Sequence, residues 1–288
     1  WTPPLICCMG RRRANRARMG QGRDVMAAAE TSQVAARIGI LGIAGRMGVL
    51  LAEESAKAGA IVSGGTRRSG EVGPYRIFPD AASLCANSDV VIDFTRAEAV
   101  EAHLAAAIAA KQPLVLGTSG LSAVQEAAVA EAATQIPIVY AANFAPGVNL
   151  LFALAERMAA ALPPEQYDAE IVEMHHRQKV DAPSGTAVAL GRAVARGRGT
   201  TLEKAGTESG RDGHTGPRRT GAIGFAALRG GQVVGEHTLL FAAGTEQIAL
   251  THRSFDRRVY ATGAVRAALW LLGQSPGLYD MKHVLGMG

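Results

Sequence analysis

The sequence predicts an α/β protein with a doubly wound parallel sheet, followed by a second, α+β domain with a mixed sheet. Three observations support this prediction. Short apolar strands alternate with helical segments from residue 37 onward, which is typical of βαβ units. A glycine-rich turn follows the first of these strands. From residue 223 apolar and polar residues alternate, which indicates half-buried strands of a mixed or antiparallel sheet.

Five strands are predicted in the first half, over residues 37–42, 60–64, 90–94, 113–116 and 137–141. Helices are predicted over residues 47–58, 97–110 and 122–133, the last with Ser122 as its N-cap. The strands end in small or polar residues. In a sheet of this kind ligands bind beyond the carboxyl ends of the strands, so we expect a binding site there.

The second half begins with a predicted helix over residues 148–162, closed by Pro163-Pro164. A strand over residues 168–174 and a helix from Ser184 to about Arg196 follow, and then a glycine-rich loop over residues 206–221. Strands are predicted over residues 223–228, 233–241 and 247–253, with a closing helix over residues 265–272.

The composition, with 48% hydrophobic and 19% charged residues among 288, is that of a globular chain and excludes a disordered one. No apolar stretch approaches the roughly 18 residues of a membrane helix, so no membrane partner is expected. The three cysteines (Cys7, Cys8 and Cys85) form neither a disulfide framework nor a zinc motif. They favour a reducing, cytoplasmic location.

The first 36 residues differ from the rest, because they are rich in arginine and lack apolar periodicity. They carry a net charge of +4 of the total of +5, so the remaining chain is nearly neutral and predicts no nucleic-acid partner. We interpret residues 1–36 as a disordered extension that is dispensable for folding and activity. A nucleic-acid-binding arm and an organellar transit peptide are the alternatives.

The glycine turn Gly42-x-x-Gly45-x-x-Gly48 lies between the first strand and its helix, where a Rossmann-like fold binds a dinucleotide. The first glycine permits the turn, the second lets the backbone approach the pyrophosphate, and the third allows close helix packing. The spacing differs from the usual GxGxxG, and an ordinary glycine-rich turn is the alternative.

The second strand ends at Thr66-Arg67-Arg68, where an NAD-binding chain usually places an acidic residue for the ribose hydroxyls. Two guanidinium groups suit a 2′-phosphate instead, so the sequence predicts NADPH as the preferred cofactor, with NADH also used. A solvated basic turn is the alternative.

The segment after the strand at 168–174 contains four cationic or titratable groups: His175, His176, Arg177 and Lys179. Ser184-Gly185-Thr186 then opens a helix whose free N–H groups attract anions. This combination predicts a carboxylate-binding site with proton donors. The alternatives are structural histidines and an Arg177 that only pairs with Glu173. Adjacent histidines on a strand point to opposite faces, so no metal is expected.

The same segment, His175-His176-Arg177-x-Lys179-x-Asp181-Ala182-Pro183-Ser184-Gly185-Thr186, resembles the signature of the 4-hydroxy-tetrahydrodipicolinate reductase family, also called dihydrodipicolinate reductases. The resemblance extends from Arg37 to about Gly286. Supporting motifs are the glycine turn, Asp93-Phe94-Thr95-Arg96, Gly117-Thr118-Ser119-Gly120, Ala141-Ala142-Asn143-Phe144, Gly213-His214-Thr215-Gly216, Gly235-Glu236-His237-Thr238 and Gly263-Ala264-Val265-Arg266.

The resemblance implies an oxidoreductase of lysine (diaminopimelate) biosynthesis that transfers hydride to C4 of a cyclic dicarboxylate with loss of water. It implies a homotetramer, a dinucleotide domain over residues 37–146 and 257–288, and a substrate and oligomerisation domain over residues 147–256. His175 is the implied acid/base group and Lys179 the proton donor, while His176, Gly185 and Thr186 hold the substrate carboxylates. The implied cofactor contacts are Gly42, Ile43, Ala44, Gly45, Arg46, Met47, Arg67, Phe94, Arg96, Gly117, Thr118, Ser119, Ala141, Ala142, Asn143, Phe144 and Arg257.

The rival enzyme class is a semialdehyde or homoserine dehydrogenase. A semialdehyde dehydrogenase needs a thiolate nucleophile, and Cys85 has no histidine near it in the sequence. An NADP-binding redox sensor without chemistry is a further alternative, but it would need neither His175 nor Lys179.

Overall fold

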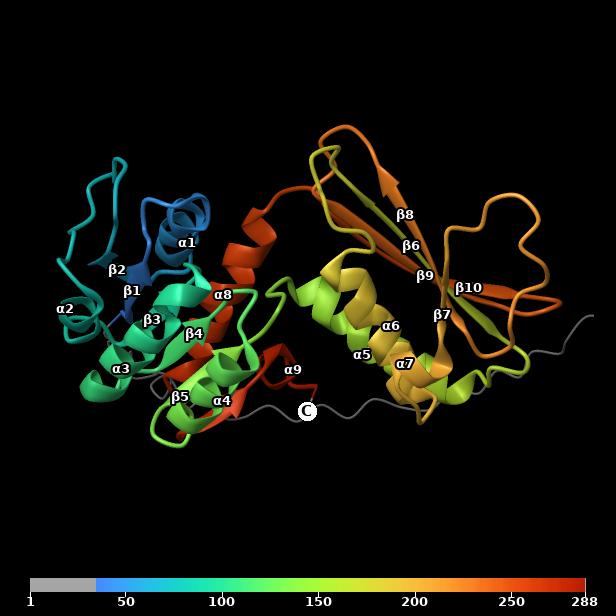
Figure 1. Ribbon diagram of the computed structural model, residues 1–288. Coiled ribbons are helices and arrows are strands. Elements are labelled where there is room, and N and C mark those ends of the chain that lie inside the picture. The colour runs from blue at the N-terminus through green and yellow to red at the C-terminus, as the bar shows by residue number, and fades with distance from the viewer. Residues whose placement is uncertain (1–34, 288) are drawn as a thin grey trace, which may run out of the picture. The chain divides into compact units, whose positions relative to one another are not determined.

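The computed structural model describes residues 35–287, and Figure 1 shows the arrangement of their helices and strands. Residues 1–34, which make up nearly all of the predicted extension over residues 1–36, lie outside the described residues. Ala36 already takes part in the first sheet, because its carbonyl accepts a hydrogen bond of 2.8 Å from the Ile61 N–H. Among residues 35–287, no helix has the length and apolarity needed to cross a bilayer.

The first sheet has six parallel strands in the order β11-β5-β4-β3-β1-β2. This arrangement confirms the predicted doubly wound sheet, since the strand order reverses at β1. The strands are β1 (Arg37–Leu41), β2 (Ile61–Gly65), β3 (Val90–Asp93), β4 (Leu114–Leu116), β5 (Pro137–Tyr140) and β11 (Gly277–Tyr279).

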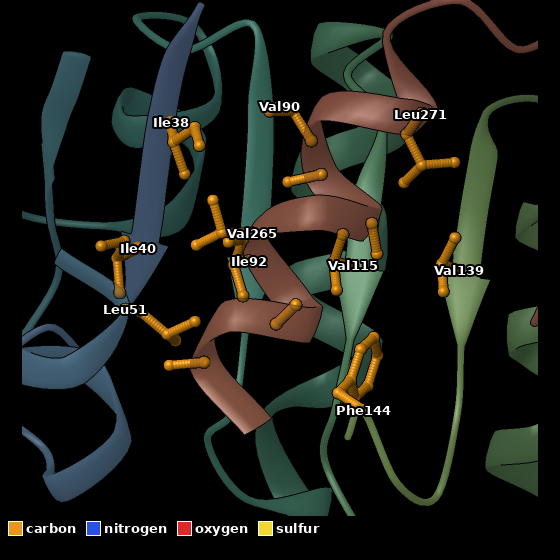
Figure 2. Packing of buried hydrophobic residues seen from close by; sticks show 14 of the residues in the cluster. Ile38, Ile40, Leu51, Val90, Ile92, Val115, Val139, Phe144, Val265 and Leu271 are labelled. Carbon is orange, nitrogen blue, oxygen red and sulfur yellow. The ribbon is translucent and has the colours of Figure 1, made fainter. Parts of the chain in front are cut away.

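Helices pack on both faces of this sheet and bury its apolar side chains in two clusters. On one face lie α1 (Arg46–Lys57), α8 (Arg258–Leu271) and α9 (Met281–Val284). Figure 2 shows Val265 of α8 among the side chains of this cluster, together with Val115 and Ile92. On the other face lie α2 (Ala81–Cys85), α3 (Val100–Ala110) with the 3₁₀ turn η1 (Ala97–Ala99) before it, and α4 (Ala123–Ala132).

The second sheet is mixed, as predicted, with the order β10-β9-β6-β8-β7. Its strands are β6 (Asp168–His175), β7 (Thr207–Ser209), β8 (Ile223–Arg229), β9 (Gly235–Ala242) and β10 (Gln247–Ser254). Strand β6 pairs in parallel with β8 and antiparallel with β9. The helices α5 (Pro146–Ala161), α6 (Gly185–Gly197) and α7 (Leu202–Ala205) contribute to the apolar cluster on one face of this sheet.

The sequence patterns do not predict five short elements of the structure: α2, α7, β7, β11 and α9. Each has only three to five residues, so its apolar periodicity is too short to detect. Helix α8 also begins seven residues before the predicted 265. Residues 258–264 include Val259, Thr262 and Gly263, which are weak helix formers, but tertiary packing of Ala261 and Ala264 outweighs that propensity.

Candidate active site

A cavity of about 890 Å³ opens at the carboxyl ends of β1, β2 and β3. This is the edge where the strand order reverses, and the volume lies within the range of small-molecule sites. Of the predicted cofactor residues, the following line this cavity: Gly42, Ala44, Gly45, Arg46, Met47, Arg67, Phe94 and Arg96. Ile43 does not, because its side chain is buried in the core of the first sheet.

The glycine turn has the geometry that a phosphate site needs. Gly42 has a left-handed φ of +73°, and its carbonyl accepts a 2.9 Å hydrogen bond from the Gly45 N–H. A Cβ on Gly48 would overlap the Gly42 carbonyl oxygen and lie 2.6 Å from the Ile43 Cα. Helix α1 has no side-chain N-cap and no acidic residue in its first turn. Its first N–H groups therefore remain available to an anion.

Thr66 and Arg67 at the end of β2 form the wall beside this turn. The Thr66 hydroxyl oxygen accepts a hydrogen bond of 3.3 Å from the Gly42 N–H, and the Thr66 carbonyl accepts one of 3.0 Å from the Ile43 N–H. Arg67 is exposed, and its guanidinium donates to the Gly70 carbonyl. Thr66 thus braces the glycine turn and leaves the positive charge of Arg67 at the rim of the cavity.

Asp93, at the end of β3, is a buried carboxylate that sequence reasoning did not assign a role. It accepts hydrogen bonds from the Thr95 N–H at 2.8 Å and the Thr95 hydroxyl at 2.6 Å. Its other oxygen lies 2.7 Å from Nδ1 of His103, which lines the cavity. Asp93 therefore holds the loop after β3 against helix α3.

Phe94, Gly117 and Phe144 come together although they follow three different strands. A Cβ on Gly117 would overlap the Phe94 ring, so only glycine allows this approach. The Phe94 and Phe144 ring centroids are 5.2 Å apart. The remaining predicted cofactor residues do not line the cavity: Thr118 is buried, Ser119, Ala142 and Arg257 are exposed, and Ala141 and Asn143 are half-buried.

His175 ends β6 on the face that packs against the helices, and a buried carboxylate orients it. Its Nδ1 lies 2.6 Å from Oε2 of Glu173, whose side chain is 1% exposed. Arg229 of β8 donates to both Glu173 oxygens at 2.8 Å, and the Ser184 N–H donates to Oε1 at 3.1 Å. Arg229, and not the Arg177 considered above, is thus the arginine that pairs with Glu173; Arg177 is exposed.

These contacts set the charge states of the site. Burial by itself would raise the pKa of Glu173, but hydrogen bonds from Arg229 and His175 hold that pKa below its ordinary value. Burial lowers the pKa of His175, although Glu173 acts in the opposite direction. Burial also lowers the pKa of His237 on β9 to about 4. Near neutral pH both imidazole rings are therefore neutral beside an ionised carboxylate.

Helix α6 begins beside His175, and its N-cap joins the same network. The Ser184 hydroxyl oxygen accepts the Ala187 N–H at 3.2 Å and lies 3.0 Å from Nε2 of His237. Gly185 is exposed, and apart from its chain neighbours and its own helix no described residue has an atom within 4 Å of where a Cβ would stand. Thr186 follows it, and its hydroxyl accepts a hydrogen bond of 3.3 Å from the Asn143 amide. The start of α6 is therefore braced and leaves space at Gly185.

Lys179 and His176 lie in the loop between β6 and α6. Nζ of Lys179 lies 2.8 Å from an oxygen of Asp181, and this pair lowers the pKa of Asp181. His176 is half-buried, and its Nδ1 has no hydrogen-bond partner among residues 35–287. Four of the five predicted substrate-side residues thus lie on the short segment from the end of β6 to Gly185, and Thr186 follows directly.

The sequence patterns do not predict Glu173, Arg229 and His237 as parts of this site. A signal existed for Glu173, because Ala169 and Ile171 mark the buried face of β6 and Glu173 is the next residue on that face. His237 stands in the family motif Gly235-Glu236-His237-Thr238, but neither that motif nor any pattern around Arg229 indicates a contact with this site. Strand register decides what the two residues meet: Glu173 pairs with Ala227 and His237.

Cys85 is not a catalytic nucleophile. It is fully buried in the core beside α2, and burial raises the pKa of its thiol to about 11. This excludes the thiolate chemistry of a semialdehyde dehydrogenase at Cys85. Among the described residues, no group of histidine, cysteine or carboxylate side chains could hold a metal ion.

The first sheet is doubly wound and has a glycine turn at the point where its strand order reverses. The second, mixed sheet carries a buried histidine–carboxylate pair. Together these features define the class of NAD(P)H-dependent oxidoreductases. Two family models match the chain. The dihydrodipicolinate reductase N-terminus model covers residues 36–144, and the C-terminus model covers residues 147–285. The chain belongs to the dihydrodipicolinate reductase family.

Individual relatives agree with this assignment. The chain is 64% identical over 255 residues to the 4-hydroxy-tetrahydrodipicolinate reductase of Granulibacter bethesdensis, covering 87% of this chain and 97% of that protein. It is 62% identical over 252 residues to the enzyme of the same name from Gluconacetobacter diazotrophicus, with the same coverage. Its activity is therefore 4-hydroxy-tetrahydrodipicolinate reductase activity in lysine biosynthesis, with NAD(P)H as the reductant.

The fold also matches a solved structure, that of dipicolinate-bound dihydrodipicolinate reductase from Paenisporosarcina sp. TG-14. The TM-score is 0.70 at 24% identity, and the match covers 85% of this chain and 97% of that one.

Proposed function

We propose that the end of β6 and the start of α6 bind the dicarboxylate substrate and exchange a proton with it, while the 890 Å³ cavity holds the nicotinamide cofactor. The observation that carries this proposal is the buried pair of Glu173 and His175, set beside the N-terminus of α6. A neutral histidine with one nitrogen held by a carboxylate is a suitable acid/base group, and helix N–H groups suit carboxylates.

His175 is the proposed acid/base group and Lys179 the proposed proton donor to the substrate. His176, Gly185 and Thr186 are the proposed carboxylate contacts. The open space at Gly185 supports this, because a carboxylate can approach the first N–H groups of α6 there. Lys179 already pairs with the carboxylate of Asp181, which shows that its ammonium group can hold an anion of this kind.

The cofactor supplies the hydride when it is bound. The glycine turn supports its placement. Gly48 packs closely on Gly42, residues 45–48 line the cavity, and the first N–H groups of α1 have no side-chain cap. Arg67 is the proposed contact to a 2′-phosphate, so NADPH is the preferred cofactor and NADH is also used. The predicted contacts that do not line the cavity (Ile43, Gly117, Thr118, Ser119, Ala141, Ala142, Asn143, Phe144 and Arg257) stay predictions, as does the division into domains.

A cytoplasmic homotetramer is the proposed assembly. The face of the second sheet opposite to α5 and α6 supports it, because Val172, Met174 and Leu240 are only half-buried there and Leu228 is 51% exposed. Apolar side chains gathered on one face are typical of a contact between subunits. Multi-angle light scattering of the full chain measures the number of subunits.

The test of the proposed function is NADPH oxidation that depends on the freshly made product of dihydrodipicolinate synthase. We expect turnover with that substrate and none with aspartate semialdehyde. His175→Ala should lower kcat by about two to four orders of magnitude, as is usual for a general acid or base. The matched control is His214→Ala, at an exposed histidine. Equal turnover in both variants would refute the assignment of His175.

A further inference from the structure

We propose that Glu173 is a positioning residue that acts at two places at once: it holds the His175 ring in one tautomer and fixes the start of α6. This inference rests on the proposed function of His175 and adds two residues, Glu173 and Arg229, that act through it. Neither touches the substrate in this proposal.

The burial of Glu173 would destabilise the fold if its carboxylate had no partners. It continues the inward face of β6 after Ala169 and Ile171, and its side chain is only 1% exposed. A buried carboxylate needs partners for both oxygens, or it is strongly destabilising. Arg229 supplies a two-point ion pair, and its guanidinium also donates to the Asp181 carbonyl at 2.7 Å. Arg229 thereby anchors the carboxylate to the loop that leads into α6.

The contact with His175 determines where the imidazole proton lies. An ionised carboxylate only accepts hydrogen bonds, so Nδ1 of His175, at 2.6 Å from Oε2, must carry the proton. The neutral ring then keeps its lone pair on Nε2. That nitrogen points toward Gly235, where a Cβ would stand only 3.1 Å away, so glycine leaves the space beside Nε2 open. Nε2 is thus the atom that can exchange a proton with a bound molecule.

The second carboxylate oxygen couples this ring to the carboxylate-binding helix. Oε1 accepts the Ser184 N–H at 3.1 Å, and Ser184 is the N-cap of α6. Gly185 and Thr186, the proposed carboxylate contacts, come next in the chain. One side chain therefore sets the acid/base atom and the anion-binding N–H groups relative to each other, which is what acid/base catalysis on a bound dicarboxylate requires.

Among the residues that the structure describes, Glu173 is also the only anion that faces His175. The other groups that face it are Lys179 from the loop, Arg229 from β8 and His237 from β9, whose ring centroid lies 5.1 Å from that of His175. Removing the negative charge therefore leaves His175 facing cations and a neutral ring. The pKa of His175 should fall further, and the limb of the pH profile that His175 controls should move to lower pH.

Two substitutions separate the two actions. In Glu173→Gln we expect the amide oxygen at the Oε1 position, because both donors there, one Arg229 N–H and the Ser184 N–H, are fixed. The amide NH₂ then takes the Oε2 position, where it faces the second Arg229 N–H and Nδ1 of His175. The ring must then accept at Nδ1 and carry its proton on Nε2, which is the wrong tautomer. We expect kcat to fall about 100-fold with KM nearly unchanged. Glu173→Ala also frees the Ser184 N–H, so KM should rise as well.

Three measurements decide the proposal. Histidine ¹⁵N chemical shifts of the free protein should show His175 protonated on Nδ1 in the unmodified chain and on Nε2 in Glu173→Gln. The pH profile of Glu173→Gln should move to lower pH. In a His175→Ala background, Glu173→Gln should lower kcat less than threefold, since it acts through His175. The matched control is Glu170→Gln, which removes the charge of a carboxylate that pairs with two arginines on the opposite face of β6.

An unchanged His175 tautomer in a folded Glu173→Gln protein would overturn the inference. So would a 100-fold loss that persists without His175, because that loss would be structural. Both results leave the role of His175 intact if His175→Ala by itself lowers kcat by about two to four orders of magnitude. Normal turnover in His175→Ala would instead refute the proposed function, while the ¹⁵N shifts would still report whether Glu173 sets the tautomer.

Discussion

Nζ of Lys179 lies 2.8 and 2.9 Å from the two carboxylate oxygens of Asp181. The proposed proton donor is therefore held by a carboxylate two residues away, in the loop between β6 and α6. Lys179→Ala is expected to lower kcat by about two to four orders of magnitude, because a general acid is lost. Steady-state kinetics with the dicarboxylate substrate measure this.

The matched control for Lys179→Ala is Lys57→Ala, which removes another lysine from an ion pair with a nearby carboxylate, Glu54. Lys57→Ala should retain the kcat of the unmodified protein. Near-normal turnover in a folded Lys179→Ala protein would remove Lys179 from the mechanism.

Arg67→Ala is expected to raise the KM for NADPH about tenfold and to leave that for NADH nearly unchanged. A charge-assisted contact to a phosphate contributes about 1.5–3 kcal/mol, and solvent exposure reduces it. Arg68→Ala should have a smaller effect. The measurement is kcat/KM for both cofactors at fixed ionic strength. Equal losses for NADPH and NADH, or an original preference for NADH, would show that Arg67 does not contact the 2′-phosphate.

Gly48→Ala is expected to weaken NADPH binding at least tenfold and to lower Tm by several degrees. The added methyl would press on the backbone of Gly42 and Ile43, and such overpacking costs about 1–3 kcal/mol. Calorimetric titration and thermal unfolding measure the two effects. The control is Gly244→Ala, since apart from its chain neighbours no described residue has an atom within 4 Å of a Cβ there. If the two alanines behave alike, the third glycine of the turn is not needed for close packing.

Stability should depend on pH through His237. Burial lowers its pKa from 6.5 to about 4, so the folded protein keeps the ring neutral where the unfolded chain protonates it. The stability that this provides is complete above about pH 6.5 and is lost as the pH falls toward 4, to a total of about 3 kcal/mol. His237→Gln should therefore lose less unfolding free energy between pH 7.5 and 4.5 than the unmodified protein.

Urea unfolding at the two pH values checks this prediction, with His214→Gln at an exposed histidine as the control. The same loss of unfolding free energy in His237→Gln and in the unmodified protein would assign the acid sensitivity to other groups.

Local pattern was sufficient to predict much of the fold. The alternation of strands and helices gave nearly correct bounds for β1, β3 and α4, and Ser122 is the N-cap of α4 in a capping box with Gln125. These features depend on residues within a few positions of each other. The three-residue strand β11 is not predicted by any local pattern. It is a strand because it pairs with β5, which lies some 140 residues earlier in the sequence.

The sequence by itself determined the two segments proposed to bind ligands in this protein: the glycine turn from Gly42 to Gly48, and the run from His175 to Thr186. In both, the chemistry lies in neighbouring residues, so a local pattern carries it. Only the tertiary structure decided that Glu173 meets Arg229 and that Asp93 meets His103, with oxygen–nitrogen distances of 2.8 and 2.7 Å. The energy of a buried carboxylate depends on which donors strand register and helix packing bring within hydrogen-bonding distance, and no local pattern specifies them.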